Sequence, residues 1–114
     1  MRTEQEKTKG QKIADFADKS LLIVDDDGPL RMRLSRAMEK KGFQVMQAES
    51  VKDGIIKANK SPPAFAVVDL RLNDGNGLEV IKEIQKLKKQ EEEKRILKKN
   101  LQDIIHNMVK IIYF

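Results

Sequence analysis

Four aliphatic residues that run directly into three consecutive acids are the feature that most constrains how this sequence can fold. Residues 21–24 are followed by Asp25, Asp26 and Asp27, and then by a glycine and a proline. A short, branched apolar run bounded by turn residues is typical of a strand buried on both faces. Carboxylates are almost never buried without a partner, so we expect the acids to project from the end of that strand.

A helix is predicted to follow the acids, over residues 28–41. Asp27 suits its N-cap position, and Gly42 suits the position just after its last turn. The apolar residues expected on its inner face follow helical spacing. They are Leu30, Leu34, Ala37 and Met38.

Residues 43–48 and 64–69 suit two further short strands, and the second of them again ends in an acid, Asp69. Between them, Ser50 is expected to cap a second helix, with Asp53 as the acidic half of a capping box. Two prolines then end that helix, because a residue before proline avoids the helical region.

Strand and helix therefore alternate three times, with the third helix opening near Leu78. This alternation predicts an α/β fold with a parallel sheet. In such a sheet the carboxyl ends of the strands meet at one edge, and ligands bind where the winding direction changes. If the first and third strands are neighbours, Asp25, Asp26 and Asp69 converge on one crevice.

Three carboxylates at one place repel one another and need a cation. Oxygen ligands in a partly aqueous pocket favour Mg²⁺ or Mn²⁺. A carboxylate beside such a metal can attack a phosphoryl donor and form an acyl phosphate. Asp69, alone at its strand end, is the better nucleophile, and the pair Asp25 and Asp26 is the better metal-binding pair.

Three segments resemble the receiver domain of two-component response regulators, and the RegA/PrrA-type group in particular. They are residues 22–27 (LIVDDD), 67–70 (VVDL) and 74–78 (DGNGL). The resemblance spans about residues 20–84. It implies an incomplete flavodoxin-like, doubly wound parallel sheet of about three βα units. The Lys, Glu and Arg residues after Gln85, with no Gly or Pro through Phe114, predict that the chain ends in a long helix, and the last residues leave open a short terminal strand after it or in its place.

The same resemblance implies roles for individual residues. Asp69 would be the phosphoacceptor, and Asp25, Asp26 and Asp69 would bind Mg²⁺ (or Mn²⁺). The main-chain carbonyl of Arg71 would be a further metal ligand, and Gly77 the glycine of the loop before the third helix. The chain would then be a phosphorelay receiver phosphorylated by a sensor histidine kinase, and no enzyme beyond self-catalysed phosphotransfer.

The later signatures of the family are not found in this sequence. Receivers carry two more strands, one ending in Ser or Thr and one ending in Lys before Pro. The only threonines here are Thr3 and Thr8, and no proline follows Pro63. Neither the Ser/Thr position nor the Lys position of the family can be assigned to a residue of this sequence. No output domain of the family is found in it either, so DNA binding is not expected. An alternative is a truncated or frame-shifted receiver with impaired phosphotransfer that acts only as an interaction protein.

The chain divides into a polar N-terminal arm (residues 1–19), a truncated receiver domain (20–86) and a charged helical tail (87–114). The formal net charge is +5, and most of the excess lies in the tail. Without a recognition motif, this charge favours a solvated helix face over a nucleic-acid surface. Apolar residues keep a heptad phase in the tail, but Gln90 and Lys94 interrupt it, so the pattern supports a long helix and only weakly a coiled coil.

The third strand is predicted to be an exposed apolar edge, which is an aggregation hazard unless covered. The tail could cover it by folding back, by forming a homodimer through residues 87–114, or by adding residues 109–114 as a fourth strand. The sequence leaves these arrangements open.

The remaining composition excludes several classes of protein. There is no cysteine, hence no disulfide framework and no Cys-based zinc site. The apolar runs are too short to span a bilayer, and no signal-peptide core follows Met1. We therefore expect a cytoplasmic protein that does not bind membranes.

Overall fold

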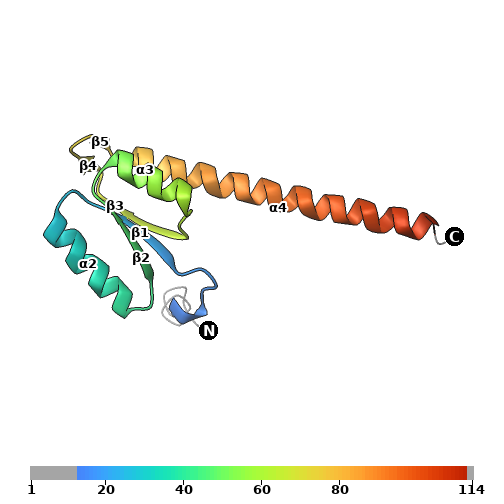
Figure 1. Ribbon diagram of the computed structural model, residues 1–114, viewed down its shortest axis with the longest axis horizontal. Helices are drawn as coiled ribbons and strands as arrows, with labels where there is room; N and C mark the ends of the chain where they lie inside the picture. Colours follow the sequence, from blue (N-terminus) through green and yellow to red (C-terminus); the bar gives the residue numbers. More distant parts are fainter. Residues whose placement is uncertain (1–12, 113–114) are drawn as a thin grey trace, which may run out of the picture. The chain divides into compact units, whose positions relative to one another are not determined.

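The computed structural model describes residues 13–112, with side chains for residues 13–106, and shows a three-stranded parallel sheet with helices on both faces (Figure 1). By their contacts the residues form two compact units. The first ends at Ile84 and contains the sheet, and the second begins at Gln85 and is helical.

The sheet is built around β1 (Ser20–Val24). Its last four residues are each at most 2% exposed, as expected of a strand buried on both faces. β2 (Gln44–Ala48) pairs in parallel with one side of β1, and β3 (Phe65–Val68) pairs in parallel with the other. The order β2-β1-β3 confirms the predicted α/β fold with a parallel sheet.

Helices cover both faces of the sheet. α2 (Gly28–Lys40) lies on one face, and α3 (Val51–Lys60) lies on the other with the first turns of α4 (Leu78–Ile112) (Figure 1). Asp27 caps α2 as predicted, because its carboxylate accepts a hydrogen bond from the Leu30 N–H at 3.0 Å.

The cap of α3 is simpler than predicted. The Ser50 hydroxyl accepts a hydrogen bond from the Asp53 N–H at 3.0 Å, as expected. The Asp53 carboxylate, predicted to complete a capping box, instead forms an ion pair with Lys57 Nζ at 3.1 Å. Lys57 lies one helical turn further on, and an acid four residues before a lysine is attracted to it along the helix surface.

The core is centred on β1 and lies on both faces of the sheet, because successive side chains of a strand point to opposite faces. Its buried apolar residues are Leu21, Leu22, Ile23, Val24, Ala48, Val51, Ala58, Leu72, Val80 and Ile84. Gly54 of α3 is also buried, and a Cβ there would lie 3.1 Å from Val80 Cγ2 and 3.2 Å from Val24 Cγ2. The missing side chain therefore lets α3 approach both β1 and α4 closely.

The inner face predicted for α2 is only partly correct. Two of its four apolar residues are half-buried, but Leu30 is 44% exposed and Ala37 is exposed too. The buried residue of α2 is Ser35, whose hydroxyl donates to the Arg31 carbonyl at 2.8 Å. Because this hydroxyl forms its hydrogen bond within the helix, a small serine can lie at the contact between α2 and the sheet. Part of the apolar stripe of α2 therefore faces away from the sheet.

β3 is an edge of the sheet among the described residues, as the sequence predicted. Val67 is 43% exposed on it. The backbone N–H of Ala64, just before β3, donates to the Ser20 hydroxyl at 2.9 Å, which ties the start of β3 to the start of β1.

Part of the predicted N-terminal arm packs on the sheet unit. A short 3₁₀ turn, Ile13–Asp15, precedes Phe16. The Phe16 and Phe43 rings each meet the Phe65 ring edge to face, with centroids 5.3 and 5.4 Å apart. Residues 1–12 of the arm lie outside the described part of the chain.

The loop after β3 contains a small hairpin that was not predicted from the sequence. β4 (Arg71–Leu72) pairs antiparallel with β5 (Gly75–Asn76). Leu72 is 8% exposed and joins the core. Gly75 has φ 151°, a positive value that glycine adopts without the steric cost of a side chain.

α4 begins at Leu78, where the third helix was expected, and confirms the predicted long helix. The alternative of a terminal strand is wrong for residues 109–112, which are helical, and residues 113–114 lie outside the described part. A strand needs a neighbouring strand to pair its backbone, whereas a helix pairs its own. Among the described residues, none of the helices combines the length and the apolar character needed to cross a bilayer.

Candidate functional site

Asp25 and Asp69 directly follow two neighbouring strands and lie at the same level along the sheet. Val24 of β1 is paired with Val68 of β3, so Asp25 and Asp69 follow side by side. The hydrogen-bonded ladder continues through both: Asp69 N–H donates to the Val24 carbonyl at 2.9 Å, and Asp25 N–H donates to the Ala48 carbonyl at 3.1 Å. Since β2 and β3 lie on opposite sides of β1, this is where the winding direction changes.

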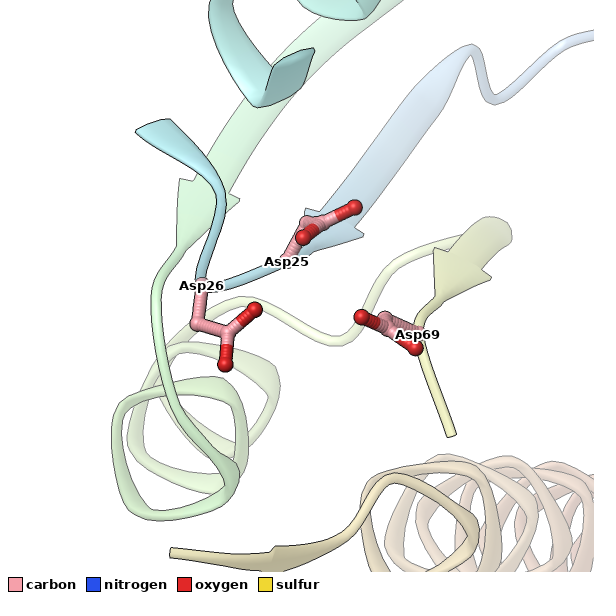
Figure 2. A group of neighbouring side chains, drawn as sticks. All are labelled: Asp25, Asp26 and Asp69. Carbon is pink, nitrogen blue, oxygen red and sulfur yellow. The ribbon is translucent and has the colours of Figure 1, made fainter. Parts of the chain in front are cut away.

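The structure brings together the three acids that the sequence places at this edge. Carboxylate oxygens of Asp25, Asp26 and Asp69 all lie within 4.8 Å of one another, and the three residues are half-buried (Figure 2). Figure 2 shows Asp25 and Asp26 on the segment that follows β1 and Asp69 on the segment that follows β3.

This arrangement suits a small, hard cation. Mg²⁺ holds oxygen ligands at about 2.1 Å, so two of its ligands lie at most about 4.2 Å apart. Modest rotations of half-exposed carboxylates close the difference from 4.8 Å. Three carboxylates at this spacing repel one another, and a divalent cation between them would remove that repulsion.

Backbone N–H groups orient two of the three acids. The Asp25 carboxylate accepts a hydrogen bond from the Asp27 N–H at 2.9 Å, and the Asp69 carboxylate accepts one from the Arg71 N–H at 3.0 Å. Each bond comes from the residue two positions further along, as in an Asx turn. These turns fix the acids where the chain leaves the sheet.

Arg71 and Gly77 belong to the loop beside Asp69. The contact that Arg71 makes with Asp69 is through its N–H, and a metal-binding role for its carbonyl stays a prediction. Gly77 is buried, and a Cβ there would lie 2.0 Å from the Asp69 carbonyl oxygen and 2.8 Å from Val68 Cγ1. Glycine is therefore needed at this position because the backbone passes so close to the acid.

Sequence reasoning missed the part played by Arg31. Its Nη1 donates to the Asp25 carbonyl at 2.6 Å, and its Nε donates to the Gln47 side-chain oxygen at 3.2 Å. Arg31 thus connects the first turn of α2 to the ends of β1 and β2, beside the acids. The available signal was a basic residue in the helical turn that directly follows them.

The contact that Asp74 makes with α3 was also missed. Its carboxylate accepts hydrogen bonds from the N–H groups of Val51 and Lys52, at 2.8 and 3.0 Å, at the start of α3. The bond from Lys52, followed by that from Val51, holds the pKa of Asp74 below its ordinary value. The β4–β5 hairpin is thereby anchored to α3.

Two curated bacterial regulators are similar to the chain over part of its length. The photosynthetic apparatus regulatory protein RegA of Cereibacter sphaeroides is 60% identical over 65 residues, which are 57% of this chain and 35% of RegA. The acid tolerance regulatory protein ActR of Rhizobium meliloti is 62% identical over 68 residues, which are 60% of this chain and 35% of ActR. The chain thus spans about a third of the length of the curated relatives it matches.

A solved structure and a family profile complete the comparison. The anti-anti-sigma factor PhyR from Bartonella quintana superposes with a TM-score of 0.57 at 19% identity, over 72% of this chain and 33% of PhyR, a likeness of fold alone. The profile described as response regulator receiver domain matches residues 21–106. Because this match covers well over half of the sequence, the chain belongs to the response regulator receiver domain family.

Proposed function

We propose that the chain is a phosphoacceptor receiver module, phosphorylated on Asp69 by a phosphohistidine of a sensor histidine kinase. The observation that carries this proposal is the convergence of Asp25, Asp26 and Asp69 within 4.8 Å at the ends of two neighbouring strands, in a chain of the receiver family. We assign the receiver to residues 20–86. Since kinases draw their phosphoryl groups from ATP, we place the module in the cytoplasm.

The transfer step follows from the chemistry of a carboxylate nucleophile. An Asp69 carboxylate oxygen attacks the phosphorus atom, and the N–P bond of the phosphohistidine breaks as the O–P bond of an acyl phosphate forms. The electron pair of the broken bond stays on the imidazole nitrogen, which takes up a proton. The hydrogen bond from the Arg71 N–H keeps the attacking carboxylate at the end of β3.

Asp25 and Asp26 would serve the same step by holding a divalent cation. Together with Asp69 and the main-chain carbonyl of Arg71, they would bind Mg²⁺ (or Mn²⁺). The ion would neutralise negative charge on the phosphoryl oxygens as they approach three carboxylates.

Phosphorylation by a small-molecule donor tests the proposal on the whole chain. The protein is incubated with acetyl phosphate and Mg²⁺, and its intact mass is measured. We expect a gain of one phosphoryl group that disappears in Asp69→Asn and when Mg²⁺ is chelated. Asp27→Asn is the matched control, because it removes a neighbouring acid, keeps a good N-cap and should still be phosphorylated. A folded sample without any gain, or a gain that persists in Asp69→Asn, would refute the proposal.

A further inference from the structure

The second unit of the chain carries a row of exposed apolar side chains along α4. Leu97 is 66% exposed, Leu101 56%, Ile104 55% and Ile105 54%. The side chains of residues 88–106 are all exposed, so nothing in the described part of the chain covers this row. Large apolar residues clustered on one helix face mark an interaction surface.

Three of the four residues of the row keep a heptad spacing, and Ile105 lies beside them at position e. With Leu87 at position a, Leu97, Leu101 and Ile104 fall at successive d, a and d positions. The helix continues to Ile112, so the same phase extends over nearly four heptads. Gln90 at position d and Lys94 at position a interrupt the apolar repeat, so the spacing alone supports a coiled coil only weakly.

The charges beside the row are complementary for two parallel copies of the helix. In a parallel pair, each g residue faces the next e residue of the other helix. Lys86 at g would face Glu91 at e, and Glu93 at g would face Lys98 at e. Both combinations are attractive and each occurs twice by symmetry. The next g position holds Asn100, which is uncharged.

Hollows lie on both faces of α4, one of them on the outward face along Glu92, Arg95, Ile96 and Lys99, so they fit this register without selecting it. A hollow on α4 is lined by Gln90, Glu93, Lys94 and Leu97. These residues occupy d, g, a and d, the four positions that receive an a-position side chain from a parallel partner. The ion pair between Glu92 and Arg95, at 2.6 Å, lies at positions f and b, away from the row.

We propose that a second copy of this chain covers the row, through a parallel two-stranded coiled coil that begins at Lys86. Lys94, at position a, would face its own copy. Polar residues at a and d lower the stability of the pair, and Gln90 at d is a second such residue beside Lys94. A polar residue at an a position also fixes register and strand number, and the lysine stem packs while its ammonium group reaches water. This inference goes beyond the proposed function and does not depend on Asp69.

The oligomeric state of the full chain gives the first test. Sedimentation equilibrium up to about 200 μM should show a monomer–dimer equilibrium at micromolar affinity. Leu101→Asp should shift the chain to monomer, because a carboxylate replaces an a-position leucine. Ile96→Asp, at the outward position c, is the matched control and should dimerise like the unaltered chain. Hydrogen exchange of the β1 amides checks that the sheet unit stays folded in each variant.

Charge reversal and cross-linking test the register. Glu93→Lys should weaken the dimer about tenfold, and Glu93→Lys combined with Lys98→Glu should restore it. Because the chain lacks cysteine, a single thiol gives a clean orientation signal. In a glutathione buffer, Leu97→Cys at position d should form a disulfide-linked dimer, whereas Glu92→Cys at position f should not.

Each alternative result would overturn the inference. A chain that is monomeric at about 200 μM does not form the pair. A dimer unaffected by Leu101→Asp uses another surface, such as the β3 edge. Equal cross-linking of the two cysteine variants, or a double reversal that fails to recover affinity, contradicts the parallel register. None of these readings involves phosphorylation, so they are independent of the test of Asp69.

Discussion

The two units of this chain share one helix but owe their structure to different interactions. In the first unit, α4 is held by packing: Val80 is fully buried and Ile84 is 6% exposed. In the second unit the same helix exposes its apolar side chains, as at Ile96 with 50%, and depends on its own hydrogen bonds and on side-chain pairs. Equal substitutions should therefore have unequal effects on the two sides of Ile84.

The largest effect is expected from Gly77→Ala in the first unit. The new Cβ would lie 2.0 Å from the Asp69 carbonyl oxygen, so the loop or the end of β3 has to move. We expect a loss of at least about 3 kcal/mol in unfolding free energy, or roughly a 12 °C fall in Tm. Thermal unfolding measures the fall in Tm, and hydrogen exchange of the β1 amides measures the loss in unfolding free energy of the sheet unit.

Gly28→Ala is the matched control for this substitution. At Gly28 the nearest atom to a new Cβ is Arg31 Nη2 at 3.9 Å, which is an ordinary contact. The unfolding free energy should change by less than about 0.5 kcal/mol. Equal losses in the two variants would show that the close approach at Gly77 is not what requires a glycine there.

Val80→Ala and Ile96→Ala compare the two units within one helix. Val80 is fully buried against α3 and β1, so its truncation should cost about 2–3 kcal/mol in the stability of the sheet unit. Ile96→Ala should leave that stability unchanged within about 0.5 kcal/mol. Urea unfolding, with hydrogen exchange of the β1 amides as the measure of the sheet unit, separates the two outcomes. A comparable loss for Ile96→Ala would mean that the units are energetically coupled.

The sequence carried enough information to predict β1, a parallel sheet and, on the condition that the first and third strands are neighbours, the meeting of Asp25 and Asp26 with Asp69; the strand order itself came from the structure. These follow from local patterns: an apolar run that stops at carboxylates, repeated once, with helices between. Parallel connections then place both strand ends at one edge. The caps at Asp27 and Ser50 were predictable for the same reason, because a cap is decided by residues within one turn.

What the sequence did not predict depends on distances between segments. The need for glycine at position 77 arises from the position of the Asp69 carbonyl, which no local pattern encodes. The periodicity of α2 shows an apolar stripe but not how much sheet lies beneath it, and Leu30 remains exposed. The β-prone residues 109–112 are helical because a strand there would have needed a partner.

Magnesium should stabilise only the first unit. If the ion binds the folded acids with a dissociation constant of about 1 mM, 10 mM Mg²⁺ adds about 1.4 kcal/mol to the unfolding free energy. Differential scanning calorimetry with and without Mg²⁺ measures this as a rise in Tm. In Asp26→Asn the rise should shrink, while Asp103→Asn in the second unit should keep it in full. An equal response in both variants would place the magnesium effect outside the acidic site.

Asp74 provides the smallest effect and a pH dependence confined to the first unit. Hydrogen bonds from Lys52 and Val51 lower the pKa of this carboxyl in the folded protein. A lowered folded-state pKa means that the contribution to stability is present above the ordinary value near 3.8 and is lost as the pH falls through the folded-state value. Asp74→Asn should therefore be less stable than the unaltered chain at pH 6, and the difference should shrink below pH 4.

Urea midpoints at pH 6, 4 and 3 measure this difference in stability. Asp103→Asn is the charge-matched control, and its stability should not converge with that of the unaltered chain at low pH. A gap between Asp74→Asn and the unaltered chain that stays constant down to pH 3 would mean that the carboxylate charge does not hold the hairpin on α3.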